Sequence, residues 1–191
     1  MNSKVSHTLY LAFRDRNFHA LRFNFRGAGG SGGSYDAGRG ERLDVAAAWR
    51  HLLQASEPVL PVDAPRVVGG FSFGSFVGMA FAHREQACSH RIAIAPPLKF
   101  DYDFSFLEDP ADLRPLYIVV GADDPFCPIP LVEQLLERLR KLAIPVLASV
   151  IPGANHMFDR CGHVLREELS SIAAQICGQQ PGEQRYGVRR L

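Results

Sequence analysis

The stretch Gly70-Phe71-Ser72-Phe73-Gly74 decides the fold expected for this chain, because a short apolar run precedes it and a longer one follows. Residues 66–71 are typical of a buried strand, and residues 76–82 are apolar enough for a buried helix. A G-x-S-x-G pattern places its serine on a sharp strand-to-helix turn, where flanking side chains would collide with the neighbouring strand or helix. We therefore predict that Ser72 occupies such a turn.

The rest of the chain alternates helical and strand patterns around this turn. Apolar residues at helical spacing predict helices within residues 4–15, 45–52, 76–82, 132–141 and 165–176, and short apolar runs predict strands at 19–25, 66–71, 91–95, 116–120 and 145–151. Strands that are apolar on both faces and alternate with helices imply a mainly parallel sheet of about five strands between helical layers. We predict one three-layer α/β domain over residues 1–177 and a flexible polar tail over 178–191.

Composition excludes several classes of protein. The 191 residues are 47% hydrophobic and 21% charged, which is ordinary for one globular domain and unlike a disordered chain. A net charge of +1 lacks the one-sided basic field of nucleic-acid binders, and no apolar run is long enough to span a membrane. Four scattered cysteines suit neither a disulfide scaffold nor a zinc site, and the start is a poor signal peptide. We expect a cytoplasmic protein that binds neither nucleic acid nor membrane.

Two further polar residues directly follow predicted strands. Asp124 lies in a Gly-Ala-Asp-Asp-Pro turn and His156 in a Pro-Gly-Ala-Asn-His turn, and each alone could be an ordinary turn residue. The carboxyl ends of parallel strands meet at one edge of the sheet, so these side chains can converge with Ser72. The chain order Ser, Asp, His is that of the α/β-hydrolase triad. Asp123 is the main rival for the acidic position, and Asp159 is a weaker one.

A second G-x-S-x-G match, Gly29-Gly30-Ser31-Gly32-Gly33, is interpreted as a decoy because no helix begins directly after it. The overlapping G-x-G-x-x-G pattern at 27–32 would require an acidic residue at the end of the next strand, where Ser72 stands instead. A glycine loop over the sheet is the favoured interpretation.

Aromatic residues alternate with polar ones between residues 100 and 106, where they could fill the core or line a binding site for an acyl chain. The stretch between Pro97 and Leu116 is too short for a multi-helix cap and its connections. Cys127 lies near Asp124 in the sequence, but no base is evident beside it, so it receives no role.

Several motifs together resemble a bacterial family of small, lidless α/β-hydrolases related to dienelactone-hydrolase-like and esterase-like proteins. The resemblance covers residues 3–177 and rests on the run RFNFRG at 22–27, the GFSFG stretch, Ala95-Pro96-Pro97, YDFSF at 102–106 and the turns that carry Asp124 and His156.

This resemblance implies a serine hydrolase that cleaves a small carboxylic ester or thioester. It makes Ser72 the nucleophile, His156 the base and Asp124 the orienting acid, with the backbone N–H of Phe73 as one donor of the oxyanion hole. It implies that no metal or cofactor takes part and that the binding partner is a small-molecule ester. A homodimer is compatible with it.

Members of this family begin with three more strands, and a Gly-containing, HPHP-like loop after the third supplies a second oxyanion N–H. This chain opens where the first helix is expected, so we expect a domain that is incomplete at its N-terminus. The absent third strand would leave a gap between the strands predicted at 19–25 and 66–71. The alternative function is therefore a catalytically weak or inactive relative with a binding or dimerisation role.

Overall fold

The sheet is a row of parallel strands, seen in a computed structural model that describes residues 3–57, 59–178 and 187–190. Its order is β1-β2-β3-β4-β5, so strands adjacent in this part of the sequence are also adjacent in space. The strands are β1 (Val67–Phe71), β2 (His90–Ile94), β3 (Leu116–Gly121), β4 (Val146–Ile151) and β5 (Gly187–Arg190). Because all pairings are parallel, every strand ends at the same edge of the sheet.

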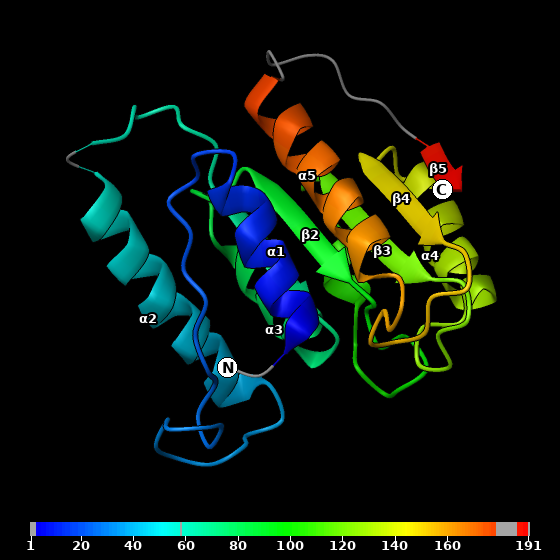
Figure 1. The fold of residues 1–191 in the computed structure, drawn as a ribbon, viewed down its shortest axis with the longest axis horizontal. Coiled ribbons are helices and arrows are strands. Elements are labelled where there is room, and N and C mark those ends of the chain that lie inside the picture. The colour runs from blue at the N-terminus through cyan, green and yellow to red at the C-terminus, as the bar shows by residue number, and fades with distance from the viewer. Residues whose placement is uncertain (1–2, 58, 179–186, 191) are drawn as a thin grey trace.

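Helices cover both faces of this sheet, which confirms the three-layer α/β sandwich (Figure 1). The helices are α1 (Lys4–Arg14), α2 (Arg39–Ser56), α3 (Phe73–Arg84), α4 (Ile129–Lys141) and α5 (Gly162–Gly178). One apolar core joins α2, α3 and α4 to one face, and a second joins α1 and α5 to the other. All residues of β3 are buried, as expected for a central strand with helices on both sides.

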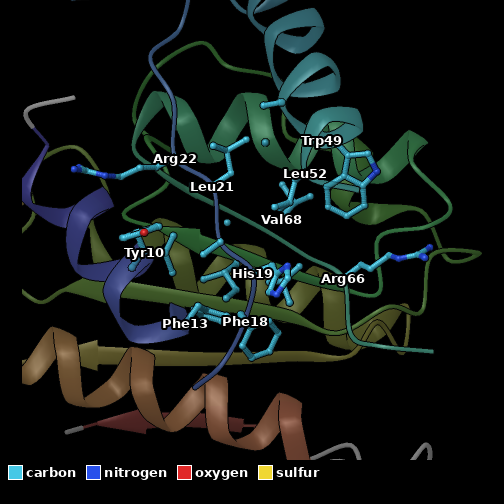
Figure 2. A pocket seen from close by; sticks show the side chains of 18 of the residues that line it. Tyr10, Phe13, Phe18, His19, Leu21, Arg22, Trp49, Leu52, Arg66 and Val68 are labelled. Atoms are coloured by element: carbon cyan, nitrogen blue, oxygen red, sulfur yellow. The ribbon is translucent and has the colours of Figure 1, made fainter. Parts of the chain in front are cut away.

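The strand predicted at 19–25 is wrong: these residues form no regular secondary structure. Figure 2 shows this segment running between α1 and α2, in front of β1 and across a cavity from it. The cavity measures about 910 Å³, and its walls include Phe13 from α1, Leu21 from the segment, Trp49 from α2 and Val68 from β1. The alternating pattern failed here because a strand also needs a partner that supplies ladder hydrogen bonds.

Because residues 19–25 form no strand, β1 is an edge strand of the sheet. Among the described residues, β1 pairs only with β2. The Ser72 N–H donates to Ile94 O at 2.9 Å, so by strand alternation the N–H groups of Val68 and Gly70 also face β2. Those of Val67, Gly69 and Phe71 then point outward, toward the cavity.

We expect amide hydrogen exchange to divide β1 into two sets. The amides of Val67, Gly69 and Phe71 should exchange much faster than those of Val68 and Gly70, because only the second set donates within the sheet. Residue-resolved NMR exchange measures both sets in the same strand, so each set is the internal control for the local stability of the other. Equal protection of the two sets would contradict an open β1 edge.

The other end of the sheet also differs from expectation. A flexible tail was predicted from residue 178 onward, yet residues 187–190 form β5 and pair with β4. Gly178 ends α5, and the remaining residues of the predicted tail, 179–186 and 191, lie outside the described part of the chain. A polar sequence can form an edge strand because backbone groups alone make the ladder.

The connection between β2 and β3 carries no cap domain. Over residues 95–115 the only helical element is the 3₁₀ helix η1 (Ser105–Glu108), so the carboxyl edge of the sheet has no helical lid. None of the described helices combines the length and apolar character needed to cross a bilayer.

Candidate active site

Ser72 lies on the tight turn that joins β1 to α3. Its backbone has φ 52° and ψ −125°, a conformation that non-glycine residues rarely adopt. The turn is held by the Ser72 N–H bonded to Ile94 O and by the Ser75 hydroxyl, which donates to Ser72 O at 2.6 Å. The predicted strand–turn–helix context is therefore present, and it holds the Ser72 side chain at the carboxyl edge of the sheet.

The two glycines of the GFSFG stretch are not equivalent. A Cβ atom on Gly70 would lie 2.2 Å from Gly74 O, so any larger residue there would push the turn apart. A Cβ on Gly74 would meet only Phe25, at an ordinary distance of 3.8 Å. Close backbone approach thus explains Gly70, whereas the predicted steric need at Gly74 is not seen in this structure.

His156 contacts the Ser72 hydroxyl directly. Its Nε2 lies 2.9 Å from Ser72 Oγ, and its Nδ1 lies 2.8 Å from Asp124 Oδ2. The three side chains come from the turns after β1, β3 and β4, and 84 residues separate the serine from the histidine. The structure therefore brings together the three polar residues singled out from the sequence.

Asp124 is fixed by its own turn as well as by His156. Its Oδ1 accepts hydrogen bonds from the N–H groups of Phe126 at 2.8 Å and Cys127 at 3.1 Å, while its side chain is fully buried. The turn role considered as an alternative for this residue is thus real, and it coexists with the contact to His156. With Oδ1 held by two donors, Oδ2 remains aimed at the imidazole.

The residues considered as alternatives lie apart from the hydrogen bonds that link Ser72, His156 and Asp124. Asp123 is exposed, and its N–H bonds to Ala154 O. Asp159 is also exposed and accepts a hydrogen bond from the Asn155 amide. The Ser31 hydroxyl donates to Asn24 O, in a loop without a helix directly behind it.

Phe73 begins α3, so its N–H is one of the first-turn donors that have no acceptor within the helix. This N–H belongs to the residue directly after Ser72. The Phe73 ring packs against Phe25 at 5.8 Å, Tyr35 at 5.4 Å and Tyr102 at 5.9 Å between ring centroids. The segment 100–106 thus contributes both to the aromatic wall beside Ser72 and, through Phe104, to the core.

Cys127 is fully buried beside Asp124. Burial raises the pKa of its thiol well above the usual range, and the negative charge of Asp124 raises it further. The thiol therefore stays protonated.

Two contributors to the site were missed from the sequence. A Cβ atom on Gly121, the last residue of β3, would lie 2.2 Å from Ala154 O, so this glycine lets the Asp124 turn approach the His156 turn. Phe126 packs edge-on against the His156 ring with centroids 4.9 Å apart. The glycine at the strand end was visible in the sequence, but its reason is a close approach between distant segments.

The cavity beside β1 is adjacent to this site without including its polar groups. Its lining contains Phe71 and Phe73 but not Ser72, Asp124 or His156. In the described part of the chain, no group of histidine, cysteine and acidic residues is arranged to hold a metal ion.

Comparison with known proteins gives relatives in sequence and in structure. None of the protein-family models matches the chain. An uncharacterised protein of Rickettsia prowazekii, RP471, is 36% identical over 162 residues. The match covers 83% of this chain but 66% of the Rickettsia protein, so the chain spans slightly less than two thirds of that relative.

Two solved structures share the fold at similar identity. An α/β serine hydrolase homologue from Coxiella burnetii is 31% identical with a TM-score of 0.76, covering 90% of this chain and 77% of its own. XC6422 from Xanthomonas campestris, an α/β serine hydrolase without a lid, is 29% identical with a TM-score of 0.78, covering 95% and 77% respectively. By its fold, its lack of a cap domain and its identity to the Coxiella protein, this chain belongs to the α/β-hydrolase family.

Proposed function

We propose that the protein is a serine hydrolase that cleaves small carboxylic esters or thioesters. The observation that carries the proposal is the continuous chain of contacts from Ser72 Oγ through His156 to Asp124, at 2.9 and 2.8 Å. Hydrogen-bonded serine, histidine and carboxylate side chains are the arrangement that activates a serine hydroxyl for acyl transfer.

The reaction proceeds in two halves. Ser72 Oγ attacks the carbonyl carbon while His156 Nε2 takes the hydroxyl proton, and the negative charge on the carbonyl oxygen is met by the Phe73 N–H. His156 then gives its proton to the departing alcohol or thiol, leaving the acyl group on Ser72. Water, deprotonated by His156, cleaves this acyl-enzyme and restores the serine. Asp124 keeps the Nδ1 proton of His156 in place throughout.

A fluorophosphonate probe tests this assignment. Ser72 Oγ is expected to bond to phosphorus as fluoride leaves and His156 takes the proton, and peptide mapping should locate the adduct on Ser72. The Ser72→Ala variant should take no label, whereas Ser31→Ala should label like the wild type. An adduct on Ser31, or full labelling of Ser72→Ala, would refute the assignment.

A binding role without efficient catalysis is the second candidate, and the open β1 edge beside the cavity favours it. An edge strand with free backbone groups can pair with another extended chain. The same probe separates the two functions, because a folded protein that leaves Ser72 unlabelled supports binding over hydrolysis.

A further inference from the structure

Two exposed phenylalanine rings stand on the histidine side of the candidate active site. The Phe126 ring packs edge-on against the His156 ring at 4.9 Å, and the Phe100 ring packs against Phe126 at 5.5 Å. They are 41% and 50% exposed, although large aromatic side chains are usually more buried. We call Phe100 and Phe126 the aromatic pair.

The aromatic pair is held firmly relative to the reacting groups. The Phe126 N–H donates to Asp124 Oδ1, and the other oxygen of this carboxylate contacts His156. The Lys99 N–H donates to Phe126 O at 3.2 Å, which ties the Phe100 segment to the Phe126 turn. The same carboxylate therefore positions both the histidine and the wall beside it, which makes the pair a preorganised surface.

The position of the aromatic pair beside His156 places it next to the alcohol portion of an ester substrate. His156 Nε2 must come within hydrogen-bond reach of the departing oxygen, so the alcohol portion lies beside the imidazole during acylation. The rings beside the oxyanion donor pack against Phe73 and include Tyr35 and Tyr102. Tyr102 also packs against Phe100 with ring centroids 6.4 Å apart, so Phe126, against His156, is the member of the pair nearer the departing oxygen. An apolar group on the alcohol would cover the exposed faces of Phe126 and Phe100, and aromatic groups gain additional energy from ring packing.

We propose that the aromatic pair binds the leaving group and makes the protein selective for esters of aromatic alcohols. This inference rests on the proposed hydrolase function and adds the substrate class and the residues that select it. Phe126 lies nearer the bond that breaks, because it touches the His156 ring. Phe100 extends the aromatic surface farther from that bond.

Matched esters isolate the effect of the alcohol. Benzyl acetate and ethyl acetate share the acetyl group and release alcohols of similar acidity, so the same acetyl-enzyme forms and only leaving-group binding differs. We expect the wild type to have the higher kcat/KM for benzyl acetate. Phe126→Ala should lower this kcat/KM about tenfold or more while changing that for ethyl acetate by less than about twofold. Phe100→Ala should show a smaller loss in the same direction.

Three controls decide the interpretation. Phe23→Ala removes another partly exposed phenylalanine, outside the aromatic pair, and should leave the ratio of the two kcat/KM values unchanged. Phe126→Tyr should restore the preference for benzyl acetate. Ethyl benzoate moves the aromatic ring to the acyl side, and its hydrolysis should be insensitive to Phe126→Ala.

Each other result overturns the inference. If Phe126→Ala lowers kcat/KM equally for both acetates, Phe126 only supports Asp124. If it lowers neither value, the aromatic pair does not bind the alcohol. If it lowers only the kcat/KM for ethyl benzoate, the pair binds the acyl group. If the wild type hydrolyses no ester and Ser72 takes no fluorophosphonate, the hydrolase function itself fails, and the inference falls with it. Labelling of Ser72 thus distinguishes the two kinds of failure.

Discussion

Replacing His156 with alanine is expected to lower kcat for hydrolysis of a short p-nitrophenyl ester by about 10⁶-fold. His156 Nε2, 2.9 Å from Ser72 Oγ, is the only group among the described residues that the structure places to take the hydroxyl proton. Without it Ser72 remains a neutral and weakly nucleophilic alcohol. His163→Ala, which removes an exposed histidine on α5, is the matched control and should keep wild-type kcat.

The double variant makes this prediction stricter. Because Ser72 and His156 act in the same step, Ser72→Ala/His156→Ala should be no slower than either single variant. Independent, multiplying losses would mean that the two residues do not act as a unit. A His156→Ala protein that melts like the wild type but retains more than about a hundredth of its kcat would contradict the proposed role.

Replacing Asp124 with asparagine is expected to lower kcat by about 10⁴-fold. The asparagine oxygen should take the place of Oδ1, which accepts the Phe126 and Cys127 N–H groups, because an amide nitrogen facing those donors would leave them unpaired. The amide nitrogen then faces His156 Nδ1 and donates to it. This stabilises the tautomer that carries its proton on Nε2, which cannot accept the Ser72 proton.

Asp123→Asn is the control at the adjacent position, since Asp123 is exposed and takes no part in the hydrogen bonds of the triad. Its kcat should match that of the wild type, and circular dichroism should show both variants folded. The reverse pattern, with loss at Asp123 and none at Asp124, would move the orienting role to the neighbouring residue and refute the assignment.

The sequence by itself was sufficient for the layered architecture and for the position of the candidate site. Strands β1 to β4 were predicted within one residue at each end, because their apolar runs end at local signals such as glycine and proline. The Ser72 turn and the positions of Asp124 and His156 after their strands followed from the same local patterns. Parallel strands share one carboxyl edge, so the convergence of the three side chains could be expected from chain order.

Tertiary structure decided the features that depend on distant partners. Residues 19–25 alternate like a strand yet form none, and polar residues 187–190 form β5, because strand formation requires a neighbouring backbone and not only a side-chain pattern. Asp124 and Asp123 are the same residue type at adjacent positions, and only the folded turn buries one against His156 and exposes the other. The close approach at Gly121 and the placement of Phe126 against His156 likewise depend on segments that are far apart in the chain, so the sequence shows these two residues but not the contacts they make.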